Sequence, residues 1–113
     1  MSERRRYASV IGPSRCEGQL EQLAYEVGAG LARAGFTVVT GGEGGAMAAA
    51  SRGASEAGGL AVGLLPGTDR SSANEHADVT VVTAVGFARN LSVVASGDVV
   101  IAALLALAEV IWT

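Results

Sequence analysis

The chain has 113 residues with one cysteine and 16 glycines, and half of its residues are hydrophobic although only 4% are aromatic. This length allows one hydrophobic core, so we expect residues 1–113 to form a single domain, and the apolar content excludes a disordered chain. A net charge of −3 argues against nucleic acid as the main partner.

Apolar runs and amphipathic or small-residue segments alternate along the chain. Short β-branched runs that stop at glycine, proline or polar residues predict buried strands, and apolar residues at three- and four-residue spacing predict helices. Gly35 follows the first helix as a C-terminal cap. In chain order we predict a strand at 7–11, a helix at 17–34, a strand at 36–40, a helix at 46–57, a strand at 60–65, a polar loop at 68–77, a strand at 79–82, a helix at 86–95 and a strand at 98–102.

Strands without polar alternation, separated by helices, indicate a parallel sheet that is covered on both faces. Right-handed crossovers then place helices on both sides, and ligands of such folds gather at the carboxyl ends of the strands. The sequence therefore predicts an α/β protein with a Rossmann-like doubly wound parallel sheet in three α/β/α layers.

Three features indicate a cytoplasmic protein. The single cysteine, Cys16, cannot form an internal disulfide, which suits a reducing compartment. No apolar signal-peptide core follows residues 1–6, and we interpret the arginines at 4–6 as a solvated leader rather than a site for an acidic partner. The longest apolar run, 99–108, has about half of the ~20 residues that span a bilayer, so we expect no membrane contact.

Glycine-rich turns follow the first two predicted strands. In the first turn, Gly12 lets the backbone approach a ligand, and Ser14 can cap the following helix or donate to a phosphate oxygen. The second turn leaves amide N–H groups free at a helix start, where partial positive charge favours anions. Glu43 opposes a directly facing phosphate unless its side chain points to water. The glycines of the second turn are Gly41, Gly42, Gly44 and Gly45.

Each of these signals has a simpler explanation. A glycine-rich strand-to-helix turn also occurs where elements pack tightly without a ligand. Met47 starts the next helix and joins the candidate site, but core packing explains it equally well.

The third turn contributes Thr83, Arg89 and Asn90 to the candidate ligand site. Arg89 is the cation of this neighbourhood, and a fixed guanidinium can bind phosphate through two parallel hydrogen bonds. The alternative is a surface arginine that is paired with a nearby carboxylate. We predict no metal site, because His76 is the single histidine and Cys16 lies far from it in sequence. Cys16 is better explained as a small buried residue than as a nucleophile.

The order of several motifs over about residues 7–102 resembles one known family. The motifs are Val10-Ile11-Gly12, the segment GGEGGAM at 41–47 with residues 48–54 after it, Gly58-Gly59, residues 63–67, Asn74, Thr83 and residues 88–90. In this order they resemble the Lonely Guy superfamily, also called lysine decarboxylase-like, and within it the branch of molybdenum-cofactor carrier proteins.

This resemblance implies a homodimer that binds a nucleotide-like ligand at the strand ends. In the phosphoribohydrolase branch, an arginine at the position of Arg89 and a later glutamate help to cleave the bond between base and ribose in a nucleoside 5′-monophosphate. In the carrier branch, the same cleft holds a pterin with its phosphate, and no reaction is needed. The implied ligand is therefore a nucleotide or a molybdopterin-type molecule.

The sequence departs from this family after residue 102. The relatives have a second glycine-rich turn and then a glutamate, whereas no glycine follows Gly97 here. Glu109 lacks the surrounding motif, so we do not assign it the catalytic role, and Arg89 is catalytic only if the chain is an enzyme.

The end of the sequence also fits a complete fold poorly. Residues 103–108 predict a helix and 110–113 a strand, which leaves too few residues for a parallel crossover. We therefore expect residues to be missing after about 102, an incomplete C-terminal part, and a spacing between neighbouring Cα atoms well above the usual ~3.8 Å between Ala102 and Val110.

Three functions remain open at this point. The first is a binding protein for a phosphate-bearing nucleotide-like or pterin ligand. The second is a phosphoribohydrolase, which needs a carboxylate near the developing sugar cation. The third is a structural or regulatory domain with a degenerate site.

Overall fold

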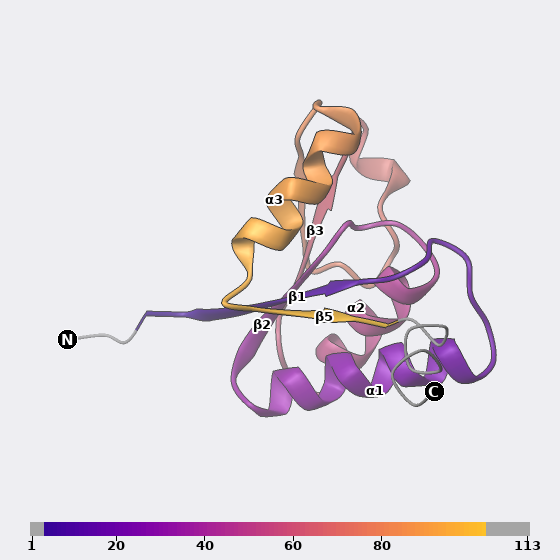
Figure 1. The fold of residues 1–113 in the computed structure, drawn as a ribbon, viewed down its shortest axis with the longest axis vertical. Helices are drawn as coiled ribbons and strands as arrows, with labels where there is room; N and C mark the ends of the chain where they lie inside the picture. The colour runs from indigo at the N-terminus through magenta and orange to yellow at the C-terminus, as the bar shows by residue number, and fades with distance from the viewer. Residues whose placement is uncertain (1–3, 104–113) are drawn as a thin grey trace, which may run out of the picture.

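The computed structural model describes residues 4–103, which form a parallel sheet with helices packed on it (Figure 1). The strands are β1 (Arg6–Ile11), β2 (Phe36–Thr40), β3 (Ala61–Leu65), β4 (Val79–Val82) and β5 (Val99–Ala102). The α-helices are α1 (Gln19–Arg33), α2 (Ala46–Glu56) and α3 (Arg89–Ser96), and the 3-10 turns are η1 (Arg70–Ser72) and η2 (Gly86–Ala88).

The strands are all parallel and lie in the order β4-β3-β2-β1-β5. The chain crosses the sheet in one direction from β1 to β4 and then returns to the other side of β1 for β5. In doubly wound folds, the crevice for a ligand opens beyond the carboxyl ends of the strands where this direction reverses. The topology confirms the predicted Rossmann-like α/β fold and places the reversal between β1 and β5.

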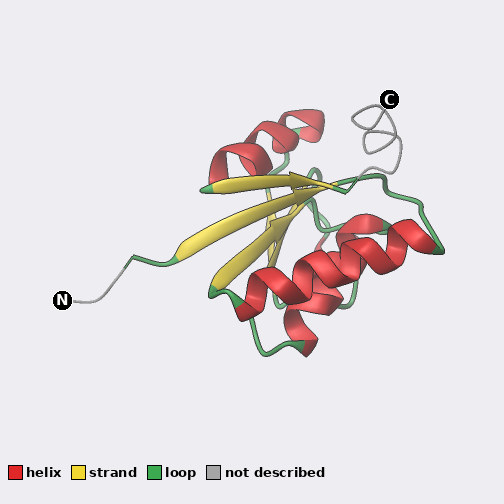
Figure 2. Cartoon of the chain, turned by 60° about the horizontal axis from the view of Figure 1, so that its bottom comes forward, coloured by secondary structure: helices red, strands yellow, loops and turns green. Residues whose placement is uncertain are grey.

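Helices lie on both faces of the sheet, as predicted: α1 and α2 cover one face and α3 lies on the other (Figure 2). The cover on the α3 face does not extend over β4. Val79 and Val81 pair with strand residues of that face and stay 43% and 41% exposed. The physical reason is that this face has one short helix among the described residues, α3 with 8 residues, which packs on β1, β2 and β3 but not on β4.

Glycine brings α1 and α2 into backbone contact. A Cβ built on Gly28 of α1 would overlap the carbonyl oxygen of Ala50 in α2, and one built on Gly53 would overlap the carbonyl oxygen of Tyr25. The close approach buries alanines of α2 against the sheet. The resulting core cluster consists of Val10, Val38, Ala50, Ala54 and Ala61.

Most predicted boundaries agree with the structure to within one residue, including the start of α2 at Ala46, and the starts of α1 and α3 differ by two and three residues. The first helix begins at Gln19 because Gly18 has a φ of 68°, so Ser14 does not cap it. At its end, Gly35 has a φ of 90° and donates its N–H to Ala32, as a C-terminal cap does. The helix predicted at 86–95 is divided into η2 and α3.

Three expectations concern residues that the structure does not describe. The helix through residue 108, the strand at 110–113 and the missing residues after about 102 lie, apart from Ala102 and Ala103, outside the described residues. Within 4–103, no helix is long and apolar enough to cross a membrane.

Candidate functional site

A cavity of about 420 Å³ opens at the carboxyl ends of β1 and β2, next to α3. It lies at the edge of the sheet where sequence reasoning placed the ligand. Its polar side chains are Ser14, Glu43, Arg89 and Asn90, and most of the remaining lining is apolar or glycine. Six of the predicted site residues line this cavity: Gly12, Ser14, Gly41, Met47, Arg89 and Asn90.

The other predicted site residues lie outside the cavity lining. Gly42 has a φ of 77° and packs on Gly63 of β3, so its role is in the turn itself. Gly44 lies against the backbone of the first turn, and Gly45 lines a different cavity. Thr83 donates its hydroxyl to the carbonyl of Leu65 at 2.7 Å and thereby ties the ends of two strands together.

The Arg89 guanidinium reaches the glycine-rich turn across the end of the sheet. Nη1 donates to the carbonyl oxygens of Gly41 at 2.5 Å and Leu64 at 3.3 Å, and Nη2 lies 2.6 Å from Oε1 of Glu43. Nε is buried and has no hydrogen-bond partner in the described part of the chain. The alternative prediction was a surface arginine that is paired with a nearby carboxylate. The pairing is confirmed, but the surface position is wrong, because the Arg89 side chain is only 8% exposed.

Local backbone geometry sets the position of Arg89 at the start of α3. The N–H groups of Ala84 and Gly86 donate to the carbonyls of Gly67 and Pro66, which fixes the turn before η2. Ala84 has a φ of 61°, a conformation that costs a non-glycine residue free energy. Gly41 supplies the space, since a Cβ there would lie 2.8 Å from Cζ of Arg89.

The N-terminus of α2 borders this cavity through Met47, whereas Gly45 and Ala48 line a different one. Gly45 precedes the helix with a φ of 61°, and the N–H of Ala46 donates to Pro13 at 3.0 Å. The next two amides, of Met47 and Ala48, donate to no residue within 4–103. Free amides in the first turn of a helix, together with the helix dipole, attract anions.

Sequence reasoning missed two residues of this site. Asn74, from the loop between β3 and β4, donates its side-chain amide to the carbonyl of Glu43 at 2.8 Å and its N–H to the carbonyl of Gly42 at 2.9 Å. It therefore clamps the glycine-rich turn, and its place in the family pattern was the available signal. Phe87 lines the cavity and is 91% exposed, for which the sequence offered no signal.

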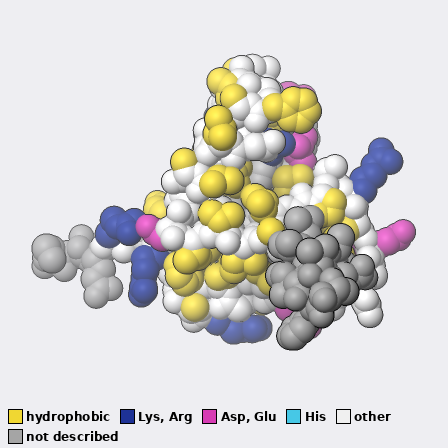
Figure 3. Space-filling view, viewed as in Figure 1, with side chains coloured by type: hydrophobic (Ala, Val, Ile, Leu, Met, Phe, Trp, Pro, Cys, Tyr) yellow, Lys and Arg dark blue, Asp and Glu magenta, His cyan; other side chains and the backbone are white. Residues whose placement is uncertain are grey.

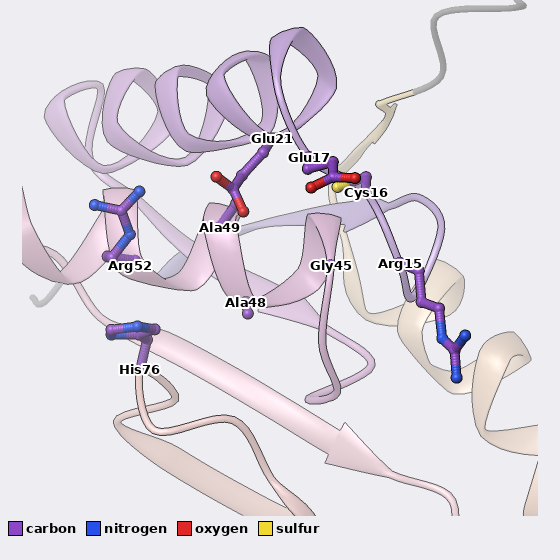
Figure 4. A pocket seen from close by; sticks show the side chains of 9 residues that line it. All are labelled: Arg15, Cys16, Glu17, Glu21, Gly45, Ala48, Ala49, Arg52 and His76. Carbon is purple, nitrogen blue, oxygen red and sulfur yellow. The ribbon is translucent and has the colours of Figure 1, made fainter.

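A second cavity, of about 490 Å³, lies between the starts of α1 and α2 (Figure 4). Arg52 and His76 lie at one end, and Arg15 points away at the other. Arg52 already stacks 4.4 Å from the centre of the Tyr25 ring. Burial raises the pKa of the Cys16 thiol, which makes it a weaker nucleophile. No group of three potential metal-ligating side chains occurs among residues 4–103.

The sheet order, the three layers and the cavity at the strand ends define a Rossmann-like α/β protein with a candidate anion site. The profile of the SLOG cluster4 family matches residues 5–107. The chain belongs to this family, and the resemblance to the Lonely Guy superfamily and its molybdenum-cofactor carrier branch is confirmed.

Two solved structures and one curated protein illustrate the relationship. The molybdenum cofactor binding protein of Rippkaea orientalis is 37% identical, with a TM-score of 0.85, over 97% of this chain and 71% of that one. The molybdenum cofactor carrier protein of Chlamydomonas reinhardtii is 33% identical, with a TM-score of 0.80, over 96% and 69%. An uncharacterized protein of Archaeoglobus fulgidus is 39% identical over 92 residues, which are 81% of this chain but only 60% of that protein's length.

Proposed function

We propose that the protein binds a small phosphate-bearing ligand of the nucleotide or pterin type in the cavity at the carboxyl edge and carries it without chemical change. One observation carries the proposal: the buried Arg89 guanidinium and the free main-chain N–H of Met47 at the start of α2 belong to residues that line the same cavity. Both are donors that favour a phosphate group.

The remaining lining supports a planar ring system next to the phosphate. Phe87, Val93 and Val94 supply apolar surface, and Asn90 and Ser14 supply hydrogen-bonding groups. A few placed polar groups in an otherwise apolar cleft are typical of a site for an organic ligand. Relatives that are named as molybdenum cofactor binding and carrier proteins support the pterin class.

Binding without reaction fits the charged groups better than hydrolysis does. Cleavage of an N-glycosidic bond needs a carboxylate that can stabilise a sugar cation. Among residues 4–103, Glu43 is the one carboxylate that lines the cavity, and it is paired with Arg89 at 2.6 Å. It therefore lies beside the guanidinium that we assign to the phosphate, and the described lining holds no second carboxylate to stabilise a sugar cation.

We also infer that a second copy of the chain covers the α3 face. Hydrophobic side chains gather on this face of the molecule (Figure 3), and the exposed fractions of Phe87 and Leu91 are 91% and 75%. Phe87 belongs to this surface and to the cavity lining, so a homodimer would shield the ligand. Light scattering after size exclusion measures the mass in solution, and a monomer at micromolar concentration would contradict this inference.

Titration calorimetry with AMP and with a pterin that carries a terminal phosphate tests the proposed ligand class. At least one of them should bind, and adenosine, which lacks the phosphate, should bind much more weakly. Arg89→Gln should weaken binding by about tenfold or more, because a hydrogen bond to a charged group contributes roughly 1.5–3 kcal/mol. Arg70→Gln, a matched loss of charge in the exposed η1 turn, should leave affinity unchanged.

The other two functions are outcomes of the same experiment. Release of adenine from AMP, detected by chromatography and abolished by Arg89→Gln, would favour a phosphoribohydrolase. Failure of both phosphate compounds to bind would refute the proposal and favour a degenerate domain.

A further inference from the structure

Two of the protein's own charged side chains meet in the cavity lining. Nη2 of Arg89 lies 2.6 Å from Oε1 of Glu43. We propose that the Glu43 carboxylate holds the place of the ligand phosphate when no ligand is bound and leaves it when the ligand binds. This inference rests on the proposed function, and it adds that a side chain of the protein competes with the ligand phosphate for Arg89.

The two partners differ in how freely they can move. Arg89 is 8% exposed, and its guanidinium also donates to two main-chain carbonyls, those of Gly41 and Leu64. The Glu43 side chain is 40% exposed at the cavity, so it can rotate into water. The backbone of Glu43 need not follow, because Asn74 holds its carbonyl at 2.8 Å. Displacement therefore requires the rotation of one side chain only.

A buried guanidinium requires a counterion, since an unpaired buried charge is strongly destabilising. Glu43 meets this requirement when no ligand is bound. A phosphate placed on the same nitrogen would repel the carboxylate at short range. The two anions therefore exclude each other, and binding exchanges one for the other.

The hydrogen bonding of Arg89 is incomplete while Glu43 is its partner. The buried Nε group has no hydrogen-bond partner among the described residues, which is costly for a donor that is removed from water. A phosphate has three terminal oxygens and can accept from Nη2 and Nε together, as paired acceptors do at a guanidinium edge. The phosphate therefore offers Arg89 a bond that Glu43 leaves unmade.

The exchange sets a threshold for binding. Every anion must first displace Glu43, and this cost is the same for all of them. A small inorganic anion has only its charge to offset the cost, whereas an organic phosphate adds contacts between its ring and the apolar lining near Phe87. Glu43 thus keeps the site free of abundant simple anions and favours a phosphate that is attached to a ring system.

The test compares the unaltered protein with Glu43→Gln by titration with whichever of AMP and the pterin phosphate binds. Glutamine can still accept from Arg89 but carries no charge, so affinity should rise by about tenfold. Glu75→Gln, a matched loss of charge at a glutamate whose side chain is 87% exposed, should change affinity by less than about twofold. Affinity that is unchanged or lower in Glu43→Gln would overturn the inference.

Adenosine serves as the control for the phosphate. Its affinity should be the same in both proteins, and an equal gain for adenosine would place the effect outside the phosphate position and overturn the inference.

A measurement on the unaltered protein covers the case in which Glu43→Gln fails to fold. The ¹⁵N–¹H resonance of Arg89 Nε should shift when AMP or the pterin phosphate saturates the site, and it should not shift with adenosine. Binding that leaves this resonance in place overturns the inference and leaves the proposed function standing. If neither phosphate compound binds, both are overturned.

Discussion

Replacing Gly28 by alanine should force apart the two helices that cover one face of the sheet. Gly28 is buried in α1, and a Cβ built there would overlap the carbonyl oxygen of Ala50 and lie 2.7 Å from its carbonyl carbon. Ordinary contact begins at 3.4 Å, so the helices must separate by more than the difference of 0.7 Å. The obstacle is the backbone of α2, which cannot rotate away as the end of a side chain can.

The expected loss of stability follows from two opposing effects. Overpacking a tight contact costs about 1–3 kcal/mol, and a clash with backbone belongs at the upper end of this range. Alanine favours a helix over glycine by about 1 kcal/mol, which offsets part of the cost. We therefore expect Gly28→Ala to lower the free energy of unfolding by roughly 2 kcal/mol.

Gly30 provides a matched control in the same helix. It is exposed, and a Cβ built on it would meet nothing within 4 Å. Gly30→Ala should therefore stabilise the protein by up to about 1 kcal/mol through helix propensity alone. Urea unfolding followed by circular dichroism at 222 nm measures both variants. Equal free energies of unfolding for the two would refute the claim that backbone contact fixes the distance between α1 and α2.

Three further substitutions or reactions test other contacts. The hydrogen bond from Arg4 holds the pKa of Asp98 below its usual range. The contribution of the Arg4–Asp98 pair to the stability of the fold is therefore complete above a pH of about 4, and it is lost as the pH falls through the lowered pKa of folded Asp98. Asp98→Asn should therefore lower the Tm at neutral pH and converge with the unaltered protein in acid. Asn74→Ala should cost about 1–2 kcal/mol in urea unfolding and weaken the binding of whichever of AMP and the pterin phosphate binds, because the glycine-rich turn loses its clamp. Cys16 should react with iodoacetamide more slowly than N-acetylcysteine does at pH 7.5, since burial raises the pKa of its thiol. In urea, where the protein is unfolded, the two thiols should react at the same rate, which would confirm that the fold is the cause.

The sequence predicted the elements well because their signals are local. The runs that became β2 and β4 are short, β-branched and bounded by turn residues, and their limits agree with the structure. Helix starts depend on single backbone angles, and nothing in the composition around Gly18 distinguished its φ of 68° from helical geometry.

The candidate site was harder to predict because its roles depend on contacts between distant segments. Gly41 makes room for a guanidinium that lies 48 residues later in the chain, whereas Gly42 packs on β3, and a spacing pattern cannot separate these roles. The pair of Arg89 and Glu43 is also a long-range contact. Sequence reasoning identified both residues but treated Glu43 as an obstacle to phosphate rather than as the partner of Arg89.

The packing of α2 links the stability of the fold to the candidate site. The glycine contacts with α1 fix the position of α2 over the sheet, and its first amide donates to Pro13 beside the cavity. The free amide of Met47, which lines the cavity, is therefore oriented before a ligand arrives, which spares the ligand the cost of ordering it. A displaced α2 would misdirect this amide while leaving Arg89, which is bound to the carbonyls of Gly41 and Leu64, in place. Gly28→Ala should consequently weaken phosphate binding even at temperatures where the protein is fully folded, and Gly30→Ala should not.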